Sequence, residues 1–194
     1  MADVGSSKLA CVNRILQQAD MLPVSSLDTG GNSDAGRAEL VLDNKSIEVQ
    51  AQGLRENTYT DTLTANGSGN VSLPGTVLDV RGSHEHAHRN FRTDGDQLYD
   101  IDNNTNNFGA GATVYVEIVY QIEFVKLSQQ SKNYITAAAA REFAQWRRPD
   151  PLKDSWGQEY VAEVSDNFKS TEEKHGERGR ITSQRPTFQS RPNN

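Results

Sequence analysis

The sequence predicts an α+β protein: a helical bundle of two N-terminal and two C-terminal helices, an inserted small antiparallel β domain, and a flexible C-terminal tail. Apolar residues recur every three or four positions near both ends of the chain, and they alternate in the middle. The final segment is rich in Gly, Arg, Ser and Pro. The expected boundaries are 1–56 for the N-terminal helical hairpin, 57–126 for the β domain, 127–175 for the C-terminal helices and 176–194 for the tail.

Composition limits the classes of protein to consider. With 194 residues, 35% of them hydrophobic, and a mean hydropathy of -0.72, the chain can bury one core. It contains no apolar run of the roughly 20 residues that span a membrane, and its start does not resemble a signal sequence. These features predict a protein that is cytosolic when made. A net charge of -6 argues against a protein whose main task is to grip phosphate backbones.

The first predicted helix precedes Pro23, which we expect to stop it. Ser6 or Ser7 can cap its start. One stripe of this helix contains five apolar residues, namely Leu9, Val12, Ile15, Leu16 and Ala19. Cys11 lies in the same segment and is the only cysteine, so an internal disulfide or a thiolate zinc cluster cannot form from one chain. We interpret it as a small residue for helix packing.

A second helix is predicted after the polar connector Pro23–Asn32. Asn32 or Ser33 can cap it, and Asp34 and Glu39 lie toward its positive end. Gly53 suits its C-terminal cap. The apolar face consists of Ala35, Ala38, Val41 and Leu42. Two helices of this size form a hairpin that must pack against another part of the protein.

The middle of the chain, Thr58–Phe124, predicts strands because it is rich in Thr, Val, Tyr and Gly. Asn66–Asn70 (NGSGN) and Thr93–Gln97 (TDGDQ) are candidate hairpin turns. Strands are expected in Asn70–Gly82 and Gly111–Phe124. The second of these is apolar on both faces, which favours a central strand.

The helical period returns at Ser128. The predicted apolar face comprises Tyr134, Ile135, Ala138, Ala139, Phe143 and Trp146, and Ala137–Ala140 permits close helix approach. Arg147–Pro151 (RRPDP) ends this helix, and Asp154 can cap the next. That last helix presents a stripe of Trp156, Tyr160, Val164 and Phe168, which we interpret as core or subunit interface. After His175 the composition is that of a segment too polar to order itself.

Several segments together resemble one known family. VNRIL, PVSSLD, NSDAGRAELVLD and EVQAQG occur in the first 53 residues, and QLYDIDNNTNNF, VYVEIVYQIEF and YITAAAAREF follow in order. This order is similar to that of the tail tubular protein A family, the adaptor (gatekeeper) ring proteins of short-tailed bacteriophages. The resemblance covers Ala10–Trp146. The chain departs from the family at Leu54–Thr58 (LRENT), where the family commonly has Trp followed by Phe-Asn.

The resemblance implies a virion protein that catalyses no reaction. We predict no cofactor and no metal site, although symmetry-related histidines in a ring would favour metal binding. It implies a homo-oligomeric ring, a dodecamer, between the portal protein and the tail nozzle (tubular protein B), with a tail fibre docking nearby. Viral DNA passes through such a ring without sequence-specific binding, and no membrane is involved. An acidic chain suits this role if its carboxylates face the lumen, because they repel phosphate. Pro23–Asn32 is then expected at one edge of the ring, which assembles in the host cytoplasm.

Two alternative functions come from other residues. His84, His86 and His88 are spaced two apart and would share one face of a strand, a pattern compatible with zinc or nickel in a histidine-dependent metalloenzyme. The neighbouring residues favour a solvated loop. A nucleic-acid-binding module would instead use the arginines of the tail.

Other site patterns are incomplete. Asp100, Asp102, Asn104 and Asn106 suggest a calcium loop, but Thr105 replaces its glycine and Gly111 replaces its final glutamate. A catalytic nucleophile is not indicated, because Cys11 lies within a helix and no GxSxG motif occurs. The carboxylates of Asp94 and Asp96 flank a turn glycine, so turn formation already explains them. No catalytic residue is therefore predicted. The residues expected to contact a partner, the portal, are Arg178, Arg180, Arg185, Phe188 and Arg191, as the tail orders on that partner.

Overall fold

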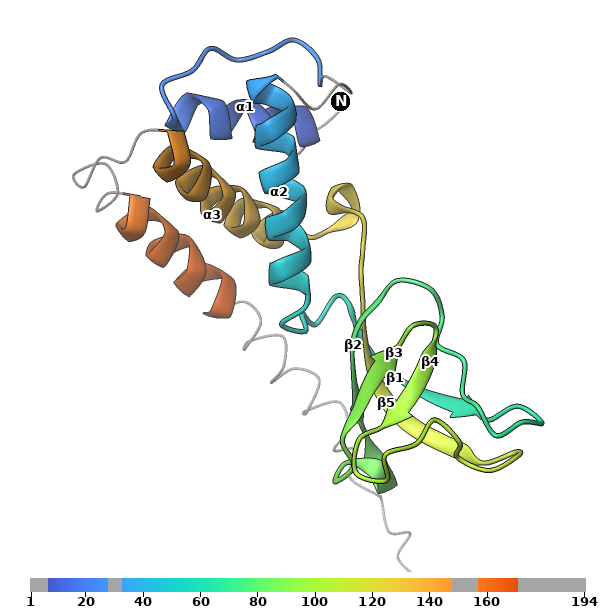
Figure 1. Cartoon of the computed structure of the whole chain (residues 1–194). Coiled ribbons are helices and arrows are strands. Elements are labelled where there is room, and N and C mark those ends of the chain that lie inside the picture. Colours follow the sequence, from blue (N-terminus) through green and yellow to red (C-terminus); the bar gives the residue numbers. More distant parts are fainter. Residues whose placement is uncertain (1–6, 28–32, 148–156, 171–194) are drawn as a thin grey trace, which may run out of the picture.

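The computed structural model describes residues 7–27, 33–147 and 157–170. The molecule is elongated, with the helices gathered at one end and the strands at the other (Figure 1). Helices α1 and α2 precede the strands β1–β5, and α3 follows them. Residues 157–170 form a further helix. The predicted α+β class is therefore confirmed.

Helix α1 (Lys8–Gln18) starts at the Ser7 cap, whose hydroxyl accepts a hydrogen bond from Ala10 N at 3.2 Å. It buries Cys11, Val12, Ile15 and Leu16, as the spacing predicted. Pro23 does not end it, because the helix stops before Ala19. The chain turns there through Asp20, which has a φ of 59°, and Met21 N donates to Leu16 O at 2.9 Å.

Helix α2 (Asp34–Gln50) starts at Ser33, whose hydroxyl accepts from Gly36 N at 3.0 Å. Its C-cap is Ala51 rather than the predicted Gly53. Gly53 lies two residues further on with a φ of +83°, a conformation that glycine adopts without the steric cost that a side chain would bring. This turn directs the chain away from the helices and into β1.

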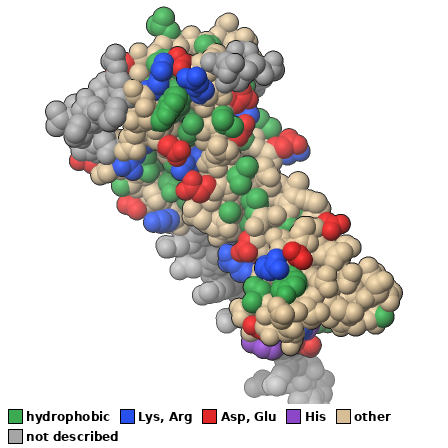
Figure 2. Space-filling model, in the orientation of Figure 1, with side chains coloured by type: hydrophobic (Ala, Val, Ile, Leu, Met, Phe, Trp, Pro, Cys, Tyr) green, Lys and Arg blue, Asp and Glu red, His purple; other side chains and the backbone are tan. Residues whose placement is uncertain are grey.

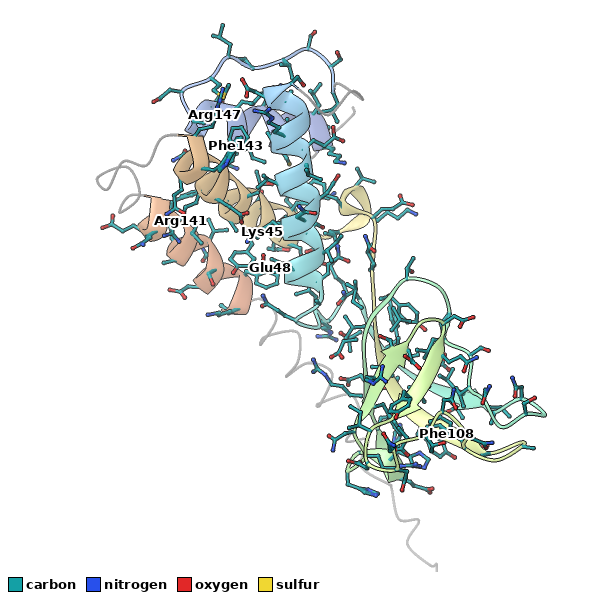
Figure 3. All side chains as sticks on the ribbon, in the orientation of Figure 1. Lys45, Glu48, Phe108, Arg141, Phe143 and Arg147 are labelled. Atoms are coloured by element: carbon teal, nitrogen blue, oxygen red, sulfur yellow. The ribbon has the colours of Figure 1, made fainter. Side chains whose placement is uncertain are left out.

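The helical core is formed by the inner faces of α1, α2 and α3 (Gln129–Arg147). Its largest fully buried side chains include Ile15, Leu42, Ile135 and Phe143. Figure 3 labels Phe143 among the helices. The buried small residues of α3, Ala137, Ala139 and Ala140, allow its neighbours to approach closely. Trp146 was predicted on the same apolar face, but it is 61% exposed, so that prediction is wrong.

Ion pairs join the three helices at their margins. Lys8 of α1 lies 2.8 Å from Glu39 and 2.9 Å from Asp43 of α2. Burial alone lowers the pKa of Lys8, but hydrogen bonds and attraction from these carboxylates outweigh it and raise the pKa above 10.5. Lys45 pairs with Glu142 across α2 and α3 at 2.7 Å.

The helix at 157–170 lies against α3. The ring of Phe168 stacks on Tyr134 with centroids 5.2 Å apart, and Phe168 packs on the helical core. Tyr160 is 38% exposed and lies under the guanidinium of Arg14, 5.5 Å from the ring centroid. Phe168 therefore contributes to packing as predicted. The expected cap Asp154 and the aromatic residue Trp156 lie outside the described residues.

The strands form two antiparallel sheets. The first has the order β1 (Thr58–Thr64), β5 (Thr113–Tyr120), β2 (Val77–Gly82), so β5 is central as predicted. The second pairs β3 (Phe91–Asp94) with β4 (Gln97–Asp100). Their core includes Val80, Leu98, Val116 and Ile118, and it is separate from the helical core.

The two candidate turns have different outcomes. Thr93–Gln97 forms the β3–β4 hairpin with Gly95 at a φ of 63°. Asn66–Asn70 is also a turn, closed by Asn66 N to Asn70 O at 2.8 Å, but β1 before it pairs with β5 rather than with the segment that follows. The strand expected from Asn70 begins only at Val77.

Candidate assembly surfaces

The junction between the helical and β parts consists of two chain crossings that bind each other through buried polar groups. Gln50, 1% exposed at the end of α2, donates from Nε2 to Ile122 O at 3.0 Å, while Ile122 N donates to Gln50 Oε1 at 2.7 Å. Asn57 is fully buried and donates from Nδ2 to Gln50 O at 3.0 Å and to Tyr120 O at 2.8 Å. These bonds fix the direction in which the sheet leaves the bundle.

Glu56 adds a second set of contacts at this junction. Its carboxylate accepts from Ser128 N at 2.7 Å and from the hydroxyl of Ser131, at the start of α3. Leu54 is 4% exposed and packs in the helical core. The segment Leu54–Thr58, where we expected a departure from the family sequence, therefore makes close contacts here. Sequence analysis missed this junction, although a Gln, a Glu and an Asn beside a helix end were its visible signal.

The outer side of α2 exposes an unusual set of large side chains. Leu40 is 60% exposed and Ile47 is 38% exposed, seven residues apart on the same stripe. At the upper end of this stripe, the guanidinium of Arg37 lies over the ring of Trp146, 5.6 Å from its centroid. We call Arg37, Leu40, Ile47 and Trp146 the α2 face. Figure 2 shows hydrophobic side chains at the surface of the helical end, interspersed with charges.

The charges around the α2 face are paired within the subunit. Lys8 pairs with two carboxylates, as described above, and Lys45 likewise contacts both Glu142 and Glu48, the latter at 2.6 Å. Figure 3 labels Lys45 and Glu48 on α2. Arg147 lies 2.9 Å from Asp34. Among the described residues, no carboxylate pairs with Arg37. Counting Arg37, four cations face five carboxylates among these described residues, so the surroundings of the α2 face have a net charge of only -1.

The helix at 157–170 presents a different surface. Glu159, Glu163 and Asp166 are exposed at spacings of four and three. Within the described part of the chain, none of these carboxylates pairs with a cation. This helix lies on the far side of α3 from α2 (Figure 1). The helical end of the subunit therefore has a neutral, apolar side and an acidic side.

The β part is acidic and mostly polar at its surface. Residues 57–126 contain nine acidic and four basic residues, a net charge of -5. Strand β1 is exposed along most of both faces, including Tyr59 at 53%. Figure 2 shows the histidine side chains at the tip of this part, away from the helices.

The three histidines do not share a strand face, so that premise of the metal hypothesis is wrong. His84 and His86 lie in the 3-10 turn η1 (His84–His86), and His88 follows it. His86 Nδ1 accepts a hydrogen bond from Tyr115 N at 3.1 Å, and its ring stacks on Tyr115. The described residues contain no group of three or more His, Cys, Asp or Glu that could hold a metal ion.

The oxygen-rich loop after Asp100 uses its side chains to bind the protein itself. Asp100 accepts from Asn103 N at 3.1 Å and pairs with Arg89, while Asp102 accepts from Asn90 N at 2.8 Å. Burial raises the pKa of Asp100, but hydrogen bonds from Asn103 and the Arg89 guanidinium outweigh it and hold the pKa below 3.8. Asn104 and Asn106 bind Tyr99 and Gln97. These contacts suit a polar loop that connects β4 to β5.

The remaining sequence candidates fall into two groups. Cys11 is a buried free thiol in α1, and Asp94 pairs with Arg92 at 3.1 Å beside the turn glycine. The predicted partner-binding residues lie outside the described residues; they are Arg178, Arg180, Arg185, Phe188 and Arg191. Part of the connector, 28–32, lies outside as well. Along the described ranges, no helix is both long and apolar enough to cross a bilayer.

The described residues thus form a subunit of two parts, each with its own core, whose notable features are its surfaces. The family model for tail tubular protein matches residues 9–184, which includes the helices, the sheets and the junction between them. The chain belongs to this family of phage tail proteins and is a structural component of the virion. No curated protein matches the chain significantly.

Proposed function

We propose that the chain forms a homo-oligomeric adaptor ring, a dodecamer, between the portal protein and the tail nozzle (tubular protein B), and that this ring is part of the DNA ejection channel. The family match over 9–184 is the observation that supports this most strongly. A tail fibre docks beside the ring. The proposal includes the division of the chain at residues 57 and 126, with the helices forming the ring body and the β part projecting from it.

The polar junction suits an adaptor because the two parts must keep one orientation when neighbouring rings load them. Hydrogen bonds between Gln50 and Ile122, and between Asn57 and Tyr120, constrain both crossings at once. Buried polar groups that are paired in this way define one geometry more strictly than apolar contacts do. A ring of such subunits would present its β parts at a uniform height and angle.

Charge suits the passage of DNA. The chain has a net charge of -6, and residues 57–126 account for -5. We infer a lumen of net negative potential, which repels phosphate and keeps non-specific DNA binding weak. An electropositive lining in the assembled ring would contradict this part of the proposal.

The C-terminal segment is the proposed contact with the portal. Residues 176–194 contain Arg178, Arg180, Arg185 and Arg191 against one acidic residue, Glu177. Arginine binds carboxylates in a bidentate manner, and Phe188 supplies an apolar anchor. Ordering of this segment on the portal would delay attachment until both rings are present, so that assembly proceeds in sequence.

Truncation after His175 tests this function. The truncated protein is expected to form rings of normal mass but to lose attachment to portal-bearing capsids in a co-sedimentation assay. A variant with the four tail arginines changed to glutamine should show the same loss, whereas Asn193→Ala is the matched control. Attachment of the truncated protein at wild-type strength would refute the assignment of the tail.

A further inference from the structure

The α2 face is the part of the described surface that is hardest to explain in an isolated subunit. Trp and Arg are the side chains most enriched at the energetic centres of protein interfaces, and here they are stacked in advance. Leu40 and Ile47 extend the surface along α2 toward the junction. Exposed large apolar side chains beside a stacked Trp–Arg pair are typical of a contact with another protein.

Charge identifies the partner as a second copy of this chain. Copies of an acidic protein repel one another unless the contact is locally neutral or complementary. Lys8, Lys45 and Arg147, together with Arg37, offset four of the five carboxylates around the α2 face, so little net charge remains there. On the other side of the bundle, the helix at 157–170 presents Glu159, Glu163 and Asp166 without a cation among the described residues, which complements the available Arg37.

The positions of these two surfaces also fit a ring. A closed ring needs two different faces on each subunit, placed on opposite sides, because each subunit contacts one neighbour with one face and the other neighbour with the second. α3 separates α2 from the helix at 157–170 (Figure 1). Within one subunit, aromatic stacking of Tyr134 on Phe168 holds the helix at 157–170 against α3, so both surfaces belong to one packed unit.

We propose that the α2 face of one subunit docks on the outer side of the helix at 157–170 of the next subunit, with Arg37 facing Glu159, Glu163 and Asp166, and that this contact closes the ring. The proposal deepens the proposed function and rests on it. The apolar side chains of α2 provide the buried centre of the contact, and the arginine selects the register against the acidic stripe.

Charge reversal tests the contact, with the mass of the assembly measured by multi-angle light scattering. Arg37→Glu should weaken assembly by about tenfold to a hundredfold in dissociation constant, the effect of an interface hot spot. A double variant, Glu159→Arg with Glu163→Arg, should weaken it similarly. Lys126→Glu is the control for charge reversal, because Lys126 is exposed, its partner Glu123 is exposed as well, and it lies outside both surfaces.

Mixing the two assembly-defective proteins provides the sharpest result. In a ring in which the two variants alternate, Glu at position 37 of one variant faces the arginines at positions 159 and 163 of the other. At every second contact, the native Arg37 faces the native acidic helix. Equimolar mixing should therefore restore rings. A folding defect could not be corrected in this way, because each subunit keeps its own substitution. Failure to recover on mixing, or normal rings from Arg37→Glu alone, would overturn the proposed contact.

An apolar variant tests the centre of the contact. Leu40→Asp should keep the wild-type circular dichroism spectrum, since the side chain is 60% exposed and lies outside the core, but the protein should be monomeric. Wild-type assembly of this variant would count against the α2 face. If the wild-type protein itself is monomeric, the proposed ring fails; if wild-type rings form and all these variants form them too, only the assigned contact fails.

Discussion

Replacing Gln50 by leucine tests whether the polar junction holds the two parts together. Leucine has a similar size, so the change removes hydrogen bonds without leaving a large cavity. The lost bonds are those from Gln50 Nε2 to Ile122 O and to Ser46 Oγ, and that from Ile122 N to Gln50 Oε1. We expect Gln50→Leu to fold but to be less stable.

The expected loss of stability follows from the two hydrogen bonds between Gln50 and Ile122. Each is worth about 1–1.5 kcal/mol net, so the free energy of unfolding should fall by about 2–3 kcal/mol. With a urea m-value of about 2 kcal/mol/M, the unfolding midpoint should fall by about 1–1.5 M. Gln52→Leu is the control, because Gln52 is exposed two residues further on and should change stability by less than about 0.5 kcal/mol.

Urea unfolding followed by circular dichroism measures the loss, and hydrogen exchange measures where it occurs. Faster exchange is expected first at Ile122, whose N–H binds Gln50, and at Tyr120, whose N–H binds Asn57 O at 2.8 Å. A midpoint for Gln50→Leu equal to that of Gln52→Leu would refute the reasoning that this junction is held by its buried polar contacts.

Three further predictions concern single elements. Phe143→Ala should cost about 3–5 kcal/mol because Phe143 is fully buried in the helical core, a loss that thermal unfolding would detect and that an unchanged melting temperature would contradict. Asp100→Asn should destabilise the β part above pH 4, because the pKa of Asp100 is lower in the folded than in the unfolded state. The ionised carboxylate contributes stability above the unfolded pKa of 3.8, and this contribution is lost as the pH falls through the folded pKa. The difference in stability between wild type and variant should therefore narrow in acid denaturation. The bonds from Tyr120 N to Asn57 O and from Ala65 N to Ala112 O set an alternation in which the backbone N–H groups of odd-numbered β1 residues point toward β5. Thr60→Pro should therefore be tolerated, whereas Asp61→Pro should lower the free energy of unfolding in urea by about 3 kcal/mol or more. Equal effects of the two variants would contradict this register.

The helices could be predicted because their signals are local. Ser7 and Ser33 cap α1 and α2 as expected, and the periodic apolar residues of α1 are buried. Trp146 shows the limit of periodicity: it continues the apolar stripe of α3, but it lies near the helix end and stacks under Arg37 at the surface. Whether an apolar residue is core or contact face depends on neighbours that are distant in sequence.

The β part was predictable in its centre and less so at its edges. The apolar faces of β5 indicated a central strand, which the order β1-β5-β2 confirms. The pairing of β1 with β5 across some 50 residues left no local signal, so Asn66–Asn70 was wrongly predicted to join two paired strands. The junction was missed although polar residues mark it, because the partner of Gln50 is Ile122, 72 residues further along the chain.

Electron microscopy of the purified full-length protein tests the central claim most directly. The account predicts closed rings of twelve subunits with an open central channel, in which the helical parts contact one another and the β parts project. Particles that are monomeric at micromolar concentration, or that form open filaments without a closed ring, would contradict it.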